Sequence, residues 1–187
     1  MTDPAVARVA ARTTVRRAIR TSLHCAIASC NPDGSPHVTP IGSILLDRDA
    51  RSGIYFDVFN ARLARNLARD PRITVLAVDS GSLRWLRALL RGRFEQSPGV
   101  QLVGTAGPAR PARPEEITRF RRLVGPLGRT PGGRAFWSDL SRVRDLRFDD
   151  ARPIHLGPMT RERRVSPRRR CPGGTSRSTG SRGDATR

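Results

Sequence analysis

The sequence predicts a domain that is mainly β with peripheral helices, and three observations lead to this prediction. Short runs rich in valine, isoleucine and aromatic residues recur through residues 24–156, as strands prefer. Turn-forming residues separate these runs, above all Asn-Pro-Asp-Gly at residues 31–34. Runs with helical spacing lie between the strand-like runs. At 187 residues, the chain is long enough for one domain with a core.

Residues 1–20 are predicted to form an N-terminal helix or arm. Apolar residues alternate with arginines in the way of a short amphipathic helix, and they include Val6, Val9 and Val15. The alternative is a frayed terminus.

A hairpin is predicted from residues 24–30 and 35–46. Proline in the intervening turn presets φ, and Gly34 accepts the left-handed conformation that closes many hairpins. Pro36 and Pro40 donate no ladder hydrogen bond, so the return strand is expected at an edge or a bulge.

A helix is predicted between two further strands. Residues 55–59 and 72–78 are rich in β-branched or aromatic residues, and a second turn leads into the first of them. Asn60 is expected to cap the helix with its side-chain oxygen. Pro71 ends the helix of residues 61–70, because a residue before proline avoids the helical region.

The start of this helix is a candidate anion site. A helix N-terminus offers unpaired N–H groups and partial positive charge. Arg62 and Arg65 lie three positions apart on one face, where they can clamp a phosphate. The alternative is that Leu63 and Leu67 pack inward and the arginines form a solvated face.

A second helix is predicted over residues 82–91. Its leucines recur at helical spacing and its arginines share the other side. We expect it to cover one end of the domain; the alternative is a basic amphipathic helix lying on a membrane. The residues concerned are Leu83, Leu86, Leu89 and Leu90, with Arg84, Arg87 and Arg91.

The C-terminal half of the domain is predicted to contain three strands and one helix. Residues 101–108 form a strand whose small residues allow backbones to approach closely. A helix begins at Pro114, with acids in its first turn. Residues 144–148 and 154–156 are expected to be closing strands, joined by a connection between them.

Net charge and composition indicate which kinds of partner and location the protein is expected to have. The net charge is +19, and all 35 basic residues counted are arginines, which genome composition or selection for anion binding would both explain. Residues 161–187 contain almost no apolar side chains, so we expect a disordered tail with nonspecific attraction for nucleic acid. The sequence has neither a membrane-span-length apolar run nor a signal-peptide core, which favours a cytoplasmic location.

The sequence lacks the residue patterns of metal sites, dinucleotide-binding sites and nucleophilic active sites. Cys25 and Cys30 lie five apart on one predicted strand and so face opposite sides. His24, His37 and His155 form no metal signature, although His155 as an axial haem ligand stays open. No dinucleotide fingerprint or nucleophile elbow is present. No metal site and no catalytic side chain are therefore predicted.

Four segments together resemble the pyridoxamine 5′-phosphate oxidase-like family of flavin-binding split β-barrels. They read AIASCNPDGSPHVTPI, GIYFDVF, RLARNLARDPRITVLAVD and VQLVGTAGPARPARPEEITRF. The resemblance covers roughly residues 20–120 and extends more loosely to 157. It implies a split β-barrel over residues 21–157, preceded by the arm of residues 1–20 and followed by a tail over 158–187.

The resemblance also implies a site. Relatives carry a basic pair at the start of the crossing helix, near the flavin phosphate. Arg62 matches the first position, Leu63 stands where a second basic residue is common, and Arg65 is one turn further on. The expected phosphate contacts are Arg62, Arg65 and Asn66. The residues expected near the ring or ribityl chain are Thr39, Pro40, Ile41, Tyr55 and Asp57.

The implied function is an oxidoreductase that depends on FMN or the deazaflavin F420 and acts on a small-molecule substrate. Relatives bind flavin in a cleft between two subunits, so a homodimer is expected. The alternative is a noncatalytic protein on the same barrel that binds haem, a nucleotide or nucleic acid. The choice between FMN and F420 stays open at the level of sequence.

Overall fold

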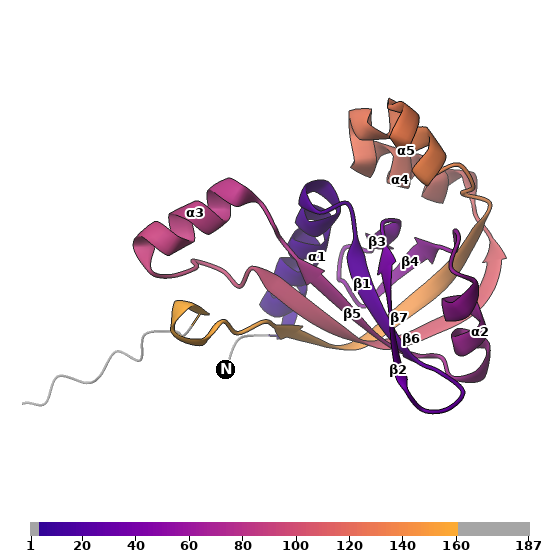
Figure 1. The fold of residues 1–187 in the computed structure, drawn as a ribbon, viewed down its shortest axis with the longest axis horizontal. Coiled ribbons are helices and arrows are strands. Elements are labelled where there is room, and N and C mark those ends of the chain that lie inside the picture. The colour runs from indigo at the N-terminus through magenta and orange to yellow at the C-terminus, as the bar shows by residue number, and fades with distance from the viewer. Residues whose placement is uncertain (1–3, 161–187) are drawn as a thin grey trace, which may run out of the picture.

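The computed structural model describes residues 4–160, and the predicted tail over 161–187 lies outside the described residues. Seven strands form one antiparallel sheet, and helices surround it (Figure 1). The elements in chain order are α1 (Pro4–Thr21), β1 (Cys25–Cys30), β2 (Pro36–Ile41), β3 (Ile44–Leu46), β4 (Ser52–Phe56), α2 (Ala61–Arg69), β5 (Arg72–Val78), α3 (Ser82–Arg91), β6 (Gly99–Pro111), α4 (Pro114–Val124), a 3₁₀ turn (Gly125–Arg129), α5 (Pro131–Phe136), β7 (Arg142–Pro153) and a second 3₁₀ turn (Gly157–Thr160).

The order of strands across the sheet is β2-β1-β5-β6-β7-β4-β3. β2 and β3 are consecutive in the chain yet lie at opposite edges, and only residues 42–43 separate them. The two edges must therefore approach each other, so the sheet curls into a half-barrel (Figure 1).

The return strand predicted over residues 35–46 is thus two strands, and this part of the prediction is wrong. β2 pairs with β1, as expected for the hairpin, whereas β3 pairs with β4. The break falls at Gly42, where a Cβ would lie 2.7 Å from the carbonyl oxygen of Leu23 and 2.7 Å from Cε1 of Phe136. The chain turns at the one residue without a side chain to obstruct this packing.

The helix and the second strand of the predicted strand-helix-strand unit are confirmed by α2 and β5, except for the helix cap. The first strand, predicted over residues 55–59, is wrong in its bounds, because β4 ends at Phe56 and residues 57–59 are outside any strand. Leu63 and Leu67 are buried in the core, as the amphipathic pattern predicts. Asn60 takes the N-cap position with φ −110° and ψ 48°, which is not the extended backbone that a capping side chain needs. Its Nδ2 donates to the carbonyl oxygen of Val58 instead, at 2.6 Å, so the expected side-chain cap is wrong.

β7 corrects the prediction of two closing strands. It runs unbroken from Arg142 to Pro153 and pairs with β6 from Pro111↔Arg142 to Val100↔Pro153, with two irregularities. The long partner strand holds residues 150–153 in the ladder, so this segment is part of β7 and not a connection. Residues 154–156 lie outside the strand.

Two clusters form the core. The larger one packs the predicted N-terminal helix α1 against the sheet through Ala11, Val15, Ala18 and Ile19. The smaller one lies under α4, where the rings of Phe56 and Phe120 pack at a tilt with centroids 5.2 Å apart. α5 was not expected from the sequence, because Gly132 and Gly133 have low helix propensity.

The predicted helix α3 is present, but it does not cover the barrel with its leucines. Ala88 is its only buried residue, whereas the four leucines are between 53% and 80% exposed. Among the residues that the structure describes, no helix is long and apolar enough to span a membrane.

Candidate cofactor-binding site

α2 is tied to the β1–β2 hairpin by one buried side chain. Asn66 is 2% exposed, and its Nδ2 donates to the hydroxyl oxygen of Ser29 and to Oδ1 of Asn31, both at 3.1 Å. A buried amide with two such bonds orients the helix against the hairpin. Asn66 therefore supports the predicted site from inside, because almost none of its surface is free to meet a ligand.

Side-chain hydrogen bonds within the hairpin turn extend this polar network. Asn31 Nδ2 donates to the Ser35 hydroxyl at 3.0 Å, and that hydroxyl donates to Asp33 at 2.6 Å. These Ser35 bonds, together with the nearby charge of Arg62, hold the pKa of Asp33 below its usual range. The bond from Asn66 to Asn31 places α2 beside the turn of the hairpin.

Arg62 and Arg65 both lie on the exposed side of α2, Arg62 in the first turn and Arg65 one turn further on. Leu63, which occupies the position of the family's second basic residue, is completely buried. Because Asn60 gives no side-chain cap, the N–H groups of the first turn are left to other acceptors. The two arginines and this helix start together form a surface suited to an anion.

The predicted ring-contact residues of β2 take different positions. Thr39 is half-buried and its hydroxyl is 2.8 Å from Nε2 of His37, and Pro40 is exposed. Ile41 is 1% exposed and belongs to the core. Thr39 and Pro40 both keep exposed surface, but on opposite faces of β2, because side chains alternate along a strand.

The short connection after β2 is bonded to the end of β4. The Ser43 hydroxyl donates to the carbonyl oxygen of Phe56 at 2.9 Å, and the Phe56 N–H donates back to the Ser43 carbonyl at 3.2 Å. This pair of bonds brings the segment containing Thr39 and Pro40 close to the segment that contains Asp57.

Tyr55 and Asp57, however, point away from a surface ligand. Tyr55 has no exposed surface, and its hydroxyl has no hydrogen-bond partner within the described part of the chain. Burial raises the pKa of this phenol above its ordinary value. Asp57 accepts a hydrogen bond from Nε of Arg144 at 2.9 Å, and the two side chains are about one-tenth exposed. Both residues therefore brace the barrel beside the site.

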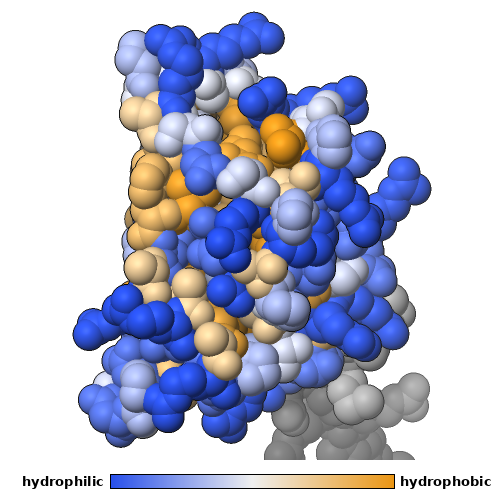
Figure 2. All heavy atoms as spheres, turned by 90° about the vertical axis from the view of Figure 1, so that its right-hand side faces the viewer, coloured by the Kyte–Doolittle hydropathy of each residue, from blue (hydrophilic) through white to orange (hydrophobic). Residues whose placement is uncertain are grey.

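The side of the molecule that carries α2 mixes the two kinds of surface that a cofactor with a ring and a phosphate needs. Figure 2 shows a broken band of hydrophobic residues bordered by hydrophilic ones on this side. Two apolar side chains have large exposed fractions, 80% for Phe59, which follows β4, and 60% for Val38, within β2.

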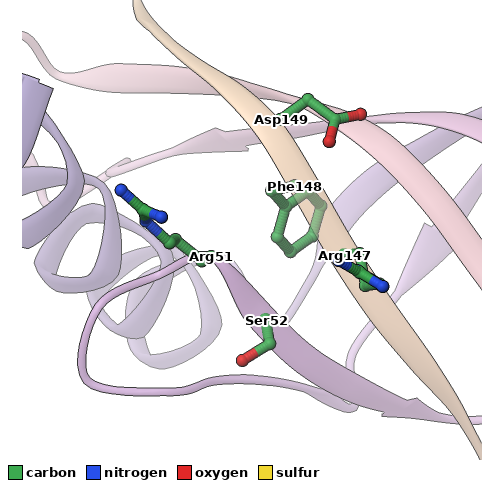
Figure 3. Close-up of a pocket in the computed structure, with 5 residues that line it drawn as sticks. All are labelled: Arg51, Ser52, Arg147, Phe148 and Asp149. Carbon is green, nitrogen blue, oxygen red and sulfur yellow. The ribbon is translucent and has the colours of Figure 1, made fainter.

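Two hollows lie elsewhere on the barrel. One, of about 390 Å³, is lined by Arg51, Ser52, Arg147, Phe148 and Asp149, with the two arginines on either side of Phe148 (Figure 3). The other, of about 620 Å³, lies between α4 and strands β4 and β7. Neither contains a predicted site residue.

The arginine at the centre of the larger hollow is already paired with acids. Arg110 bonds Glu116 at 2.7 Å and Asp145 at 2.6 Å, and it holds the pKa of both carboxyl groups below their usual values. Arg119 pairs with Asp47 at 3.2 Å across the same hollow. These pairs are structural bonds, and they do not concentrate positive charge as the start of α2 does.

The described residues are not arranged for a reactive cysteine or for a metal site. Burial raises the pKa of the Cys25 thiol to about 12, which makes it a poor nucleophile, and Cys30 faces the opposite side of β1. Within residues 4–160, no group of three or more His, Cys, Asp or Glu side chains is arranged to hold a metal ion.

A family model described as pyridoxamine 5′-phosphate oxidase matches residues 11–139, which hold the sheet from β1 to β6 together with α2. The chain belongs to the pyridoxamine 5′-phosphate oxidase family. The resemblance proposed from the four sequence segments is thereby confirmed, and the curled sheet is a split β-barrel.

Solved structures agree with this fold. An FMN-binding protein from Syntrophomonas wolfei subsp. wolfei has a TM-score of 0.57 and 11% identity, with 81% of this chain and 88% of that chain covered. HupZ from Group A Streptococcus has a TM-score of 0.51 and 16% identity, with 79% and 93% covered. At these identities the likeness is one of fold. No curated protein matches the sequence.

Sequence reasoning missed four residues that build this region of the family fold, namely Ser29, Asn31, Ser35 and Arg144. The first three lie in or beside the Asn-Pro-Asp-Gly turn, which predicts a turn but carries no sign of its bonds to α2. Arg144 lies 87 positions from Asp57, so no local pattern links the two.

Proposed function

We propose that this member of the family binds a flavin-type cofactor, FMN or F420, with its phosphate at the start of α2, and acts as an oxidoreductase on a small molecule. The observation that carries the proposal is the exposed pair Arg62 and Arg65 on a helix start that has no side-chain cap. Guanidinium groups bind phosphate oxygens bidentately, and free N–H groups add to the same site.

The residues of the chain bind and orient the cofactor, whose ring would supply the hydride chemistry. Arg62 and Arg65 hold the phosphate, while Asn66 keeps α2 against the hairpin from below. Thr39 and Pro40 contribute surface on the path from the phosphate to the ring. Asp57, held by Arg144, supports that surface without touching the ligand.

A homodimer completes the proposal, and the outer face of the sheet supports it. Residues paired across neighbouring strands point to the same face. Two such rows contain mostly apolar side chains that are half-buried or exposed, in contrast to the buried residues alternating with them. The rows are Val38-Ala28-Thr74-Val103 and Pro40-Ala26-Leu76-Gln101.

Replacing Arg62 by alanine should weaken FMN or F420 binding by about 1–3 kcal/mol, the range of a charge-assisted hydrogen bond. Fluorescence titration of both cofactors into wild type and variant measures the change. Arg69→Ala is the matched control, because it is also exposed but lies at the opposite, partially negative end of α2. Equal affinities in wild type and Arg62→Ala would remove Arg62 from the site.

The absorption spectrum of the purified protein tests the cofactor class directly. Bound flavin, deazaflavin and haem have distinct bands. A colourless protein that takes up neither FMN nor F420 would favour the noncatalytic alternative.

Replacing Leu76 by arginine should convert the dimer to a monomer, because it introduces a charge at the centre of the proposed interface. Sedimentation at micromolar concentration measures the mass, with Leu127→Arg as a control at an exposed leucine away from the sheet. A wild-type protein that is monomeric and still binds flavin with full affinity would contradict a cleft shared between subunits.

A further inference from the structure

Helix α3 carries an apolar face that is mostly exposed. Successive helical positions are rotated by 100°, so its four leucines gather on one side and Ala88 lies on the other. The exposed fractions are 59% for Leu83, 53% for Leu86, 62% for Leu89 and 80% for Leu90. Isolated exposed leucines need no explanation, but four on one helix face indicate an interaction surface.

Contacts on the opposite face hold the helix in this orientation. Trp85 Nε1 donates to the carbonyl oxygen of Asp79 at 2.7 Å, and the Trp85 ring packs edge-on against Phe94 with centroids 5.0 Å apart. Arg84 pairs with the Asp79 carboxylate at 3.0 Å and donates to the Gln96 carbonyl at 3.0 Å. With this side anchored, the leucines are directed away from the barrel.

The shape of the region suits a flat and deformable partner. α3 projects beyond the sheet, at the end away from α4 and α5 (Figure 1). Neither of the two hollows includes an α3 residue. A projecting helix lacks the walls that would enclose side chains of a protein partner, whereas lipid headgroups rearrange around it.

The positive charge of α3 favours an anionic lipid surface over a second copy of this chain. α3 contains three arginines and no acidic residue, and Arg93 lies two residues after its end. Arg87 and Arg91 are exposed beside the leucines, Arg91 with a bond to Glu95. A second copy of this chain would bring like charges together, in a protein with net charge +19. Anionic headgroups complement the same arginines.

We propose that α3 docks the protein on an anionic lipid surface. The leucines enter the boundary between headgroups and acyl chains, and Arg87 and Arg91 meet the lipid phosphates. One short apolar face binds a membrane weakly by itself, so the flanking arginines supply the second attraction that reversible docking needs. The surface is independent of the cofactor site, because α2 and α3 lie at opposite ends of β5.

Vesicle co-sedimentation of the full chain tests this proposal. Two sets of vesicles are compared, one of phosphatidylcholine alone and one that also contains phosphatidylserine. We expect clear binding to the second set, weakened by salt, and at least about tenfold weaker binding to the first. Equal binding to both sets, or no binding to either, would overturn the proposal.

Variants separate the helix from the other arginines of the chain. The double substitution Leu86→Gln and Leu90→Gln should reduce binding to the anionic vesicles about tenfold or more, because it removes buried apolar area. Leu127→Gln, an exposed leucine outside α3, should leave it unchanged. A thermal melt checks that each variant is folded.

Two outcomes with the double variant would contradict docking on lipid. Unchanged vesicle binding would assign the attraction to arginines elsewhere in the chain. A change in oligomeric state without a change in vesicle binding would assign the leucine face to an interface between copies. Loss of vesicle binding with unchanged flavin affinity supports the proposal, and it leaves the proposed oxidoreductase function untouched.

Discussion

Replacing Gly104 by alanine should destabilise the barrel by at least about 3 kcal/mol, at the upper end of the range for overpacking. A Cβ at this position would lie 1.9 Å from the carbonyl oxygen of Arg147 and 2.8 Å from its carbonyl carbon. The obstructing atoms are backbone atoms of β7, so no side chain can rotate to make room. The ladder between β6 and β7 has to open at a point where it is already irregular.

Urea denaturation of wild type and Gly104→Ala measures this difference in the free energy of unfolding. Gly107→Ala is a matched control in the same strand, because its Cβ would lie 3.6 Å from the nearest atom, the carbonyl oxygen of Asp145. We expect the control to change stability by less than about 1 kcal/mol. Similar losses in the two variants would show that the close approach at Gly104 is not the cause.

Replacing Arg144 by alanine should cost about 3–5 kcal/mol, because it leaves the Asp57 carboxylate buried without its partner. Arg144 donates through Nε to Asp57 at 2.9 Å and through a second nitrogen to the Gly107 carbonyl at 3.2 Å. The side chains of Arg144 and Asp57 are only 9% and 10% exposed. The variant therefore loses both bonds and strands a charge between β4 and β7.

A double-mutant cycle distinguishes this cause from the loss of arginine packing. Adding Asp57→Asn to Arg144→Ala should recover part of the lost stability, since a neutral amide is easier to bury than a lone carboxylate. Arg72→Ala removes an exposed pair with Asp70 and should leave the denaturation midpoint nearly unchanged. If the changes in the free energy of unfolding of the two single variants simply add up in the double variant, the ion pair contributes no coupling energy.

The elements that the sequence predicted well are those whose signals are local. α2 ends before Pro71, β1 and β2 pair around the Asn-Pro-Asp-Gly turn, and α4 begins at Pro114. Within these segments, backbone restriction by proline and the spacing of apolar residues decide the conformation. The family resemblance rests on the same segments, which is why it was confirmed.

Predictions failed where a distant segment supplies the partner. Residues 35–46 have a continuous strand-like pattern, but the chain bends at Gly42 because Leu23 and Phe136 pack against that point. Residues 149–153 suggest a connection in the sequence, yet this segment belongs to β7 and its residues 150–153 pair with β6. The N-cap at Asn60 failed because the backbone there is not extended.

By itself, the sequence determined the basic helix start, since Arg62 and Arg65 alternate with Leu63 and Leu67 at a spacing that places the arginines outside. Only the tertiary structure decided which of the other predicted polar residues keep exposed surface. Tyr55 is buried by the core, and Asp57 turns inward to a charge on β7. The same holds for α3, whose periodicity defines an apolar face but not its direction. Its anchoring by Trp85 and Arg84 directs that face outward, because periodicity is a property of one segment whereas orientation depends on contacts with others.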